Sequence, residues 1–336
     1  MRVCIVGSGW YGCHVATYLL ERGHAVTLLD RESELFSGAS SHNQNRLHLG
    51  FHYPRSKPTI DECQRGFSKF RNQYGECVVS FERNNYLIHN SSRVTLNEYL
   101  SLFSDYQLVK PDIPTCHVAP IYVQVKEAYI NFRKARELFA HLIPYVKVSS
   151  AQFLRIDTDS VTLDGLTYDY VINCTNNQWV PRSLPFVPLY ENVCTLIYHI
   201  PFGETTGYTV MDGPFFSIYP YDIEASLYTI THVALSVLTR GGHLVEPDTD
   251  IDGVRTLIEK EVRSVLPSLE MTYHSYFISK KTKYDVETDD RSLRVFREGR
   301  YLSFSGGKIT GIFETEPILD EILLEQTPQS TPASLP

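Results

Sequence analysis

The sequence predicts an α/β fold in two parts: a domain built on a parallel sheet and a domain built mostly from antiparallel strands. Three observations carry this prediction. A strand, a glycine-rich turn, a helix and a second strand follow one another within the first thirty residues. Residues 181–284 contain a run of tyrosine-rich strand patterns, interrupted by one helical segment. Residues 300–325 return to a strand, a glycine turn and a helix, so the parallel sheet combines distant parts of the chain.

The composition is that of a globular protein and disfavours two classes of partner. The chain has 336 residues, 43% hydrophobic and 21% charged, which suits two domains with large cores. Its net charge of −8 argues against nucleic acid, because phosphate binding needs a basic face. No apolar run approaches the roughly 18 residues of a membrane helix, and no signal-peptide pattern is present. Seven scattered cysteines without a CxxC pair indicate reduced thiols, so we expect a cytoplasmic protein without an integral membrane segment.

The first strand–helix–strand unit follows from hydrophobic patterning. Residues 2–6, "RVCIV", predict a short buried strand, and residues 24–30, "HAVTLLD", predict a second strand that ends in an acid. Residues 14–23 between them predict a helix, with apolar residues on one face and Gly23 at its C-terminal end. The short connections favour parallel pairing of the two strands.

The turn between the first strand and the helix has the GxGxxG spacing, with Gly7, Gly9 and Gly12. The first glycine permits the tight turn, the second lets the backbone approach a pyrophosphate, and the third lets helix and strand pack closely. The helix N-terminus would face the phosphates with its amide groups. Asp30 ends the second strand, where a carboxylate can accept both ribose hydroxyls. These residues predict a dinucleotide site and leave FAD and NAD both open.

The later segments predict alternating helices and strands. Helices are expected over 59–75, 94–104, 126–143 and 250–266, and strands over 78–89, 119–125 and, as a run, 145–179. The third helix is strongly amphipathic, with an apolar stripe of Tyr129, Phe132, Leu138 and Leu142. Residues 327–336, rich in Pro, Ser and Thr, are expected to be a disordered tail.

Four pieces of the sequence resemble the D-amino acid oxidase-like (DAO) family of FAD-dependent oxidoreductases, in that family's order. The first is "GSGWYGCHVATYLLERGHAVTLLDRE", similar to the FAD fingerprint. The second is "SGASSHNQNRLHLGFHYPRS", residues 37–56, whose second half resembles the HxGxxYxPxS pattern of the L-2-hydroxyglutarate dehydrogenases. The third, "YDYVINCTNNQW", resembles a later strand of the family, and the fourth, "YLSFSGGKITGIF", resembles the GGKLT turn of the glycerol-3-phosphate dehydrogenases.

The resemblance implies a Rossmann-like FAD-binding domain of the glutathione-reductase-like kind, joined to a mostly antiparallel substrate domain. The FAD-binding domain would comprise 1–76, 119–180 and 285–326, and the substrate domain 77–118 and 181–284. The active site would lie between them, over the flavin ring. FAD is expected to be non-covalent, because no cysteine follows Cys194 where sarcosine oxidases attach their flavin, while a link through His42 or His48 stays open.

The resemblance also implies which residues contact FAD. Residues 37–56 would run from the phosphates to the flavin ring, and Gly50 would allow close approach to the ring. Amides of the C-terminal turn would bond the flavin's pyrimidine oxygen. "NNQW" stands where the family has a glycine, which leaves the contact there open. The expected set is Gly7, Gly9, Trp10, Tyr11, Gly12, Asp30, Arg31, Ser40, Ser41, Asn45, Arg46, Leu47, Gly50, Cys174, Thr175, Gly306, Gly307, Lys308, Ile309 and Thr310.

Residues 37–56 also supply the candidates for catalysis. A neutral imidazole suits the removal of a hydroxyl proton, and His52 is the first candidate, with His48 and Tyr53 beside it. The HxxxH spacing can bind metal on a helix, but Gly50 and Pro54 disfavour a helix and no acid is near, so no metal is expected. Arginine forks suit carboxylates. The expected substrate-binding residues are Arg46, Arg55, Tyr219, Tyr221, His232 and Arg240.

These features predict an FAD-dependent oxidoreductase that oxidises a small amino acid, amine or 2-hydroxy acid by hydride transfer to flavin N5. Electrons would pass to oxygen or a quinone, and the oligomeric state is open. Three alternatives remain. One is an NAD-dependent dehydrogenase that shares only the first strand–helix–strand unit. The second is a flavoenzyme that acts on a sugar or natural-product intermediate, with or without net oxidation, and the third is a non-catalytic flavin-binding protein.

Overall fold

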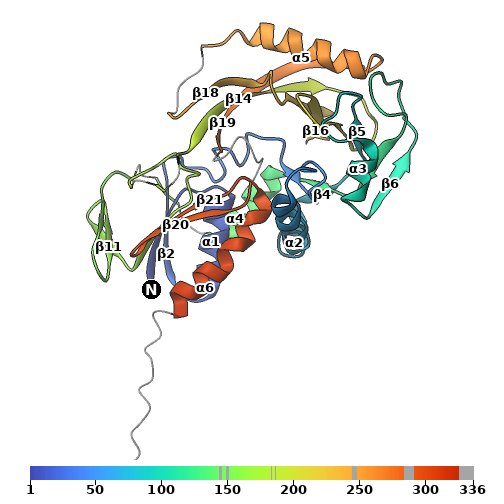
Figure 1. Ribbon diagram of the computed structural model, residues 1–336. Coiled ribbons are helices and arrows are strands. Elements are labelled where there is room, and N and C mark those ends of the chain that lie inside the picture. The colour runs from blue at the N-terminus through green and yellow to red at the C-terminus, as the bar shows by residue number, and fades with distance from the viewer. Residues whose placement is uncertain are drawn as a thin grey trace, which may run out of the picture.

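The computed structural model describes residues 1–143, 146–148, 151–182, 184–185, 187–243, 248–283 and 291–324. Two sheets dominate it (Figure 1). A six-stranded sheet carries the first strands of the chain, with α1 and α6 packed beside it. A nine-stranded sheet lies at the other end of the molecule, with α5 along its outer side. The α/β fold class, with a Rossmann-like sheet and a mostly antiparallel second sheet, is confirmed.

The six-stranded sheet has the order β20-β21-β13-β1-β2-β9. Its neighbours pair in parallel except β20, which runs antiparallel to β21 at one edge. The central strand is buried except at its first residue, as its apolar sequence predicts. The strands are β1 (Arg2–Val6), β2 (Ala25–Asp30), β9 (Val146–Val148), β13 (Tyr170–Asn173), β20 (Arg294–Glu298) and β21 (Tyr301–Ser305).

An aromatic core packs under this sheet. Trp10 lies at its centre, with its ring centroid 4.9 Å from Phe36, 5.1 Å from Phe70 and 5.4 Å from Phe139. Three helices and the turn after β2 bring these side chains together from distant segments, so the core ties the domain's pieces into one body. The helical elements are α1 (Trp10–Glu21), α2 (Lys57–Tyr74), η1 (Gly75–Cys77), α4 (Phe132–Leu142), η2 (Ile309–Thr315) and α6 (Glu316–Leu324).

The nine-stranded sheet has the order β18-β14-β17-β16-β15-β5-β7-β6, with β19 paired along the whole of β14. All its pairs are antiparallel except β15 with β5. Its strands are β5 (Arg83–Ile88), β6 (Tyr106–Val109), β7 (Tyr122–Val125), β14 (Leu189–His199), β15 (Thr206–Met211), β16 (Phe216–Asp222), β17 (Leu227–His232), β18 (Val237–Gly241) and β19 (Thr272–Lys283). Helices α3 (Leu96–Ser101) and α5 (Ile251–Val265) flank it.

Two small sheets complete the fold. One is the meander of β10 (Leu154–Ile156), β11 (Val161–Leu163) and β12 (Leu166–Tyr168). The other joins β3 (Arg46–Leu47) and β4 (Val78–Ser80) to β8 (Ala128–Ile130), which lies between them. This second small sheet matters for function, because it holds the middle of the polar segment 37–56 in place.

The prediction of one helix over 126–143 is wrong. Residues 128–130 form β8, and the helix begins after Asn131, whose side chain caps it by accepting from the amides of Arg133 and Lys134. Tyr129 therefore belongs to a strand, and Leu142 is 40% exposed. The predicted apolar stripe is wrong because residues 126–143 contain both the strand β8 and the helix α4. The buried helical residues are Ala135 and Phe139.

The domain boundaries stay a prediction, and two strands depart from them. The strand β7 falls within 119–180, which we assigned to the FAD-binding domain, but it pairs with β5 and β6 in the nine-stranded sheet. The strand β4 falls within 77–118, yet it pairs with β8 beside the polar segment. The expected tail, 327–336, lies outside the described residues.

Candidate active site

The N-terminal glycine turn has the close packing that a dinucleotide cradle requires. Gly7 has φ +102°, and a Cβ there would lie 2.8 Å from the carbonyl oxygen of Cys174. A Cβ on Gly12 would lie 1.8 Å from the carbonyl oxygen of Gly7. A side chain at Gly7 would collide with the chain after β13, and one at Gly12 would push α1 away from β1, so the close packing of the turn suits the pyrophosphate of FAD.

Polar side chains surround this turn. Asp30 Oδ2 accepts from the backbone amide of Ser8 at 2.6 Å and from its hydroxyl at 2.7 Å. The hydroxyl of Ser40 accepts from the amide of Trp10, the first residue of α1, at 3.1 Å. The start of the polar segment thus lies at the helix N-terminus, where the phosphates of a dinucleotide bind.

The C-terminal glycine turn lies against the N-terminal one. The hydroxyl of Tyr11 donates to the carbonyl of Lys308 at 2.8 Å, although the two residues are 297 positions apart. A Cβ on Gly306 would lie 1.7 Å from that hydroxyl, so only glycine fits beside Tyr11. The two turns and the polar segment therefore form one continuous surface, as the resemblance implies for an FAD site.

Several expected FAD contacts have other structural roles. Trp10 points into the aromatic core, and Leu47 is fully buried, so both side chains contribute to the core of the domain. Gly50 has φ +96°, and a Cβ there would lie 2.9 Å from Cα of Ile60, so packing on α2 explains this glycine without a flavin. Arg31 is exposed, with its Nε 3.8 Å from Glu32 Oε1.

The other expected contacts support the turns through local packing and hydrogen bonds. Cys174 lies in the core behind Gly7, and the hydroxyl of Thr175 donates to Asn173 and accepts from the amide of Trp179. Ser41 donates to the carbonyl of Phe36. The remaining positions are set by local packing: the Asn45 carbonyl accepts from Ile130, a Cβ on Gly307 would touch Arg291, Ile309 packs on the core, and Thr310 is buried beside Cys63.

A cluster of cations and histidines lies where the polar segment meets the C-terminal turn. The rings of His48 and His52 stack with centroids 5.7 Å apart, and Tyr53 lies 5.1 Å from His52. The ammonium of Lys308 lies 4.0 Å from the centroid of the Tyr53 ring. Arg46 Nη1 is 3.4 Å from His52 Nδ1. These five residues, which we call the histidine cluster, bring together all three predicted catalytic residues.

The electrostatics of the histidine cluster favour neutral imidazoles. Burial, followed by the charges of Lys308 and Arg46, holds the pKa of His48 well below its usual 6.5. Burial, followed by Arg46, His48 and Lys308, does the same to the pKa of His52. Burial and the charge of Arg46 lower the pKa of Lys308 to about 7. Both histidines are therefore uncharged at neutral pH, as a proton acceptor must be.

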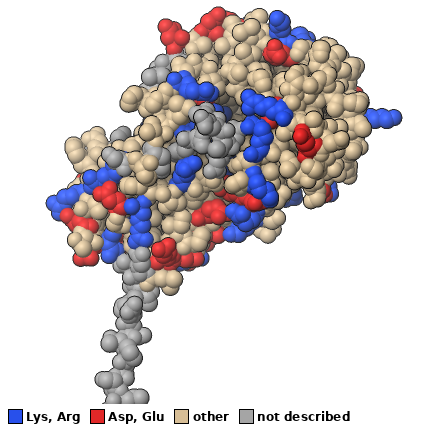
Figure 2. Space-filling view, viewed as in Figure 1, with Lys and Arg blue, Asp and Glu red and all other residues tan. Residues whose placement is uncertain are grey.

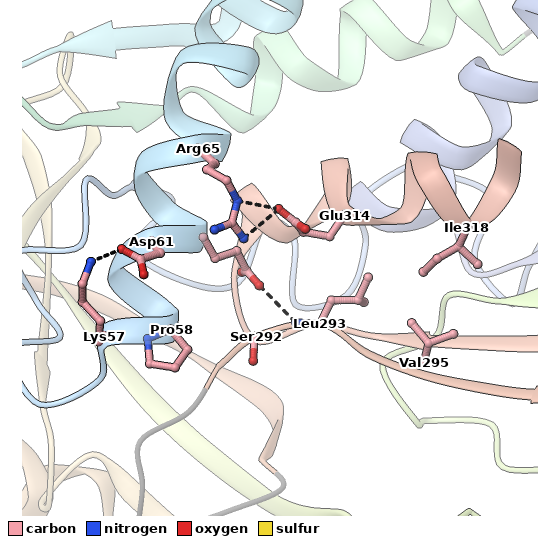
Figure 3. A pocket seen from close by; sticks show the side chains of 10 residues that line it. Lys57, Pro58, Asp61, Arg65, Ser292, Leu293, Val295, Glu314 and Ile318 are labelled. Atoms are coloured by element: carbon pink, nitrogen blue, oxygen red, sulfur yellow. Dashed lines mark hydrogen bonds and ion pairs between the residues drawn. The ribbon is translucent and has the colours of Figure 1, made fainter. Parts of the chain in front are cut away.

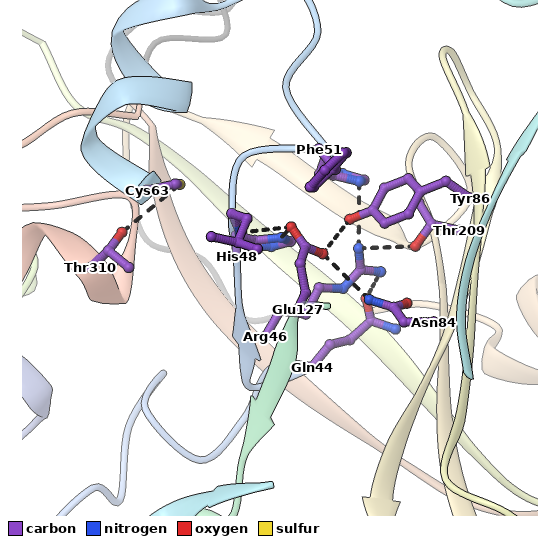
Figure 4. Close-up of polar contacts among 12 residues, drawn as sticks. Gln44, Arg46, His48, Phe51, Cys63, Asn84, Tyr86, Glu127, Thr209 and Thr310 are labelled. Carbon is purple, nitrogen blue, oxygen red and sulfur yellow. Dashed lines mark hydrogen bonds and ion pairs between the residues drawn. The ribbon is translucent and has the colours of Figure 1, made fainter. Parts of the chain in front are cut away.

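Glu127 is a member of the site that the sequence reasoning missed (Figure 4). Its side chain is fully buried, and Oε1 lies 3.6 Å from His48 Nδ1. It accepts from the amide of Leu49 at 2.7 Å and from the hydroxyl of Tyr86 at 2.6 Å. Burial raises its pKa. The available signal was an acid just after the predicted strand 119–125, at a position that we assigned to a helix.

The two tyrosines predicted to bind substrate have different neighbours. Tyr219 is fully buried, and the guanidinium of Arg46 stacks 3.6 Å above its ring centroid, so Tyr219 orients that arginine. Tyr221 lies at an irregularity in β16, between Pro220 and Asp222, with its ring 6.1 Å from the rings of both Phe132 and Phe277. The expected pairing of Tyr219 and Tyr221 on one side is thus interrupted by the bulge.

Three other predicted substrate-binding residues are occupied elsewhere. Nδ1 of His232 accepts from the amides of Ala234 and Leu235, so this ring closes its own turn. Arg240 Nη2 lies 2.7 Å from Oε1 of the buried Glu191. Arg55 Nε lies 2.7 Å from Asp212 Oδ2. Sequence reasoning could not find the partners of Arg240 and Arg55, because each of these two pairs joins segments distant in the chain.

A further cation, Lys281 of β19, approaches the same region. Burial, followed by the charge of Lys283, lowers the pKa of Lys281 to about 8, and Arg46 and Arg291 contribute in the same direction. Glu191 opposes them. Lys and Arg side chains also gather near the middle of one face of the molecule (Figure 2). The region around Arg46 is therefore suited to an anion.

A surface hollow of about 550 Å³ lies apart from the histidine cluster, between α2, β20 and the segment of η2 and α6 (Figure 3). Its charged walls pair with one another: Arg65 with Glu314 at 3.2 Å, and Lys57 with Asp61. The amide of Leu293 donates to Glu62 at its floor. None of the predicted site residues lines this hollow, so we do not assign the chemistry to it.

Within the described ranges, no group of three or more His, Cys, Asp and Glu side chains is arranged to hold a metal ion. The same part of the chain contains no helix that is long and apolar enough to cross a membrane. None of the seven cysteines takes part in a disulfide bond, and Cys116 is the exposed one.

The chain is similar to known FAD-dependent proteins in sequence and in fold. Residues 2–115 match the DAO family model, described as FAD dependent oxidoreductase. The FAD-dependent monooxygenase FPY4 of Fusarium mangiferae is 32% identical over 331 residues, which cover 92% of this chain and 87% of that protein. The FAD-dependent monooxygenase kojA of Aspergillus flavus is 26% identical, over 96% of this chain and 86% of that protein.

Solved structures share the fold at low sequence identity. Glycine oxidase from Geobacillus kaustophilus has a TM-score of 0.72 at 15% identity, over 99% of this chain and 97% of that one. NikD, an amino acid oxidase of nikkomycin biosynthesis, has a TM-score of 0.75 at 14% identity, over 98% and 95%. Together with the cradle of glycines and the 32% identity, these findings show that the chain is an enzyme of the DAO family of FAD-dependent oxidoreductases.

Proposed function

We propose that this enzyme oxidises a small anionic 2-hydroxy acid, with an amino acid or amine as the second candidate, by hydride transfer to flavin N5. The observation that carries the proposal is the histidine cluster, where Arg46 and Lys308 lie against two neutral imidazoles. The cations attract a carboxylate and disfavour an ammonium group, which ranks a hydroxy acid above an amine.

FAD would lie along the surface formed by the two glycine turns and the start of the polar segment. The turn at Gly7–Gly12 would take the pyrophosphate, Asp30 the ribose, and Gly306 to Lys308 the flavin end. When bound, FAD supplies the acceptor for a hydride from the substrate carbon. The bond from Tyr11 to Lys308 would hold the two turns at the spacing of the cofactor. Non-covalent attachment remains part of the proposal.

The protein's own residues would bind the substrate and take its proton. Arg46 is held by Gln44 Oε1 at 2.7 Å and by the ring of Tyr219, so its fork is oriented before substrate arrives. Lys308 would support the same carboxylate from the other turn. A neutral histidine would take the hydroxyl proton, which alcohol oxidation requires.

The fate of the electrons divides two versions of the proposal. Oxygen or a quinone would accept them if the enzyme is an oxidase or a dehydrogenase. The similarity to two proteins named FAD-dependent monooxygenases favours an alternative reaction, in which one atom of O₂ enters the organic product. Turnover under ¹⁸O₂ separates the two, since only a monooxygenase places the label in the organic product.

The test of the main proposal is anaerobic bleaching of the flavin near 450 nm with a panel of matched substrates. Pairs that differ only in a 2-hydroxyl or a 2-amino group should bleach the flavin faster with the hydroxyl. Faster bleaching by amines would reverse the ranking. If neither set bleaches it, the proposal fails in favour of a flavoenzyme that acts on a sugar or natural-product intermediate.

A further inference from the structure

His48 and His52 stack on each other but have partners of opposite kinds. His52 Nδ1 lies 3.4 Å from Arg46 Nη1. A guanidinium can only donate, so this nitrogen of His52 must be the unprotonated one, and the ring proton lies on Nε2. Arg46 therefore occupies the lone pair that His52 would need to accept a proton.

The partner of His48 is an acceptor. Its Nδ1 lies 3.6 Å from Glu127 Oε1, and in the described part of the chain this buried nitrogen has no hydrogen-bond partner at shorter range. A carboxylate only accepts, so it favours the proton on Nδ1 and leaves the lone pair on Nε2. Contacts of this kind are often long before substrate binds and shorten when it does.

Glu127 is itself fixed from three directions. Leu49, next in the chain to His48, donates its amide, Tyr86 of β5 donates its hydroxyl, and Asn84 Nδ2 lies 3.5 Å away. Its side chain is fully buried, and His48 is 5% exposed. The carboxylate therefore holds the imidazole at a defined angle, as an acid does behind a catalytic histidine.

We propose that His48, not His52, accepts the proton of the reaction and that Glu127 is its positioning residue. This inference rests on the proposed oxidation of a hydroxyl group. In the step, the substrate O–H bond breaks and the proton goes to His48 Nε2. The C–H bond breaks and its electron pair leaves with the hydrogen as hydride to FAD, while the C=O bond forms.

The charges around His48 explain why it needs Glu127. Arg46 and Lys308 oppose its protonation, and His52 and Tyr53 pack against its ring without a negative charge. Glu127 supplies a negative charge against His48 in the described structure, opposite in sign to the charges of Arg46 and Lys308. The carboxylate stabilises the imidazolium that forms when the substrate proton arrives.

The substitution Glu127→Gln tests the inference in the holoenzyme. Its amide can turn an N–H toward His48 Nδ1, which forces the proton to Nε2. We expect anaerobic flavin bleaching to slow about 100-fold with little change in substrate affinity, which is the low end for losing proton transfer. The acid limb of the pH–rate profile should also move to lower pH.

The matched control is Glu62→Gln, which alters a second buried carboxylate and should keep the wild-type rate. A wild-type rate and pH profile in Glu127→Gln would overturn the inference.

A second measurement does not depend on the substrate or on the variant retaining FAD. Long-range ¹⁵N NMR of the holoprotein distinguishes the two tautomers of each histidine. We expect the proton of His48 on Nδ1 and that of His52 on Nε2, and the reverse pattern would overturn the inference. If the expected tautomers are found but no hydroxy acid bleaches the flavin, the proposed function is wrong, whereas the positioning of His48 by Glu127 is retained.

Discussion

The glycine turn at residues 7–12 and the histidine cluster with Glu127 are built in different ways. In the turn, three glycines within six residues shape the backbone, and one short stretch of sequence carries nearly all the information. In the cluster, the loop after β3 contributes three side chains, and β3, the segment before β8 and the C-terminal turn contribute one each. The cofactor site can thus be predicted from one short segment of sequence, whereas the histidine cluster forms only when folding brings distant segments together.

The largest expected effect breaks the locally built region. In Gly12→Ala, the new Cβ would lie 1.8 Å from the carbonyl oxygen of Gly7, and neither backbone can yield without separating α1 from β1. We expect a loss of at least about 3 kcal/mol of stability, with a melting temperature lower by about 10 °C. Bound FAD should be lost as well. Thermal melts and the absorbance at 450 nm measure the two effects.

Gly75→Ala is the control for this substitution. A Cβ at Gly75 meets no atom within 4 Å, and the residue has φ −58°, which alanine adopts readily. Equal damage from both variants would mean that the crowded contact at Gly12 does not hold the turn.

Arg46→Gln tests the assembled region. The variant removes the charge that stacks on Tyr219 and faces His52, while keeping a polar side chain. We expect KM for an anionic substrate to rise roughly 10- to 100-fold, since a hydrogen bond to a charged group contributes about 1.5–3 kcal/mol. Steady-state kinetics measure this. Arg133→Gln, which alters an exposed arginine, is the control and should leave KM unchanged.

The pH dependence sharpens the same contrast. The pKa values of His48 and His52 are lowered in the folded protein, so the unfolded chain takes up protons first as the pH falls below 6.5. Stability should therefore fall between pH 6.5 and the lowered pKa values, while the raised pKa of Glu127 opposes this loss. Melting temperatures from pH 7 to 5.5 measure the slope, and His48→Asn should reduce it. An unchanged slope would show that His48 titrates normally.

Arg240→Ala should have the smallest effect. This arginine is 49% exposed, and Glu191 keeps Lys283 at 2.7 Å when Arg240 is removed. The cost should be about 1 kcal/mol, because the arginine is half-exposed and Lys283 still compensates the charge of the buried Glu191. Substrate KM should stay within about twofold of wild type in steady-state assays. A much larger rise in KM would return Arg240 to the substrate-binding residues.

Much of the fold could be predicted because its signals are local. The apolar run of β1, the glycine spacing and the acid at the end of β2 each follow from backbone geometry within a few residues. The prediction failed over 126–143, where β8 and α4 share one apolar run, and only pairing with β3 and β4 shows that 128–130 are extended. Family membership also excludes the NAD-dependent and non-catalytic alternatives.

The sequence by itself determined the dinucleotide turn, the two-part architecture and the segment that carries the histidines, since each depends on neighbours in the chain. Only the tertiary structure decided which side chains meet. It placed Glu127 against His48, packed the Trp10 side chain into the aromatic core and Gly50 against α2, and paired Arg240 with Glu191. The physical reason is range: backbone preferences act over a few residues, whereas burial and hydrogen bonding act between groups that folding brings together.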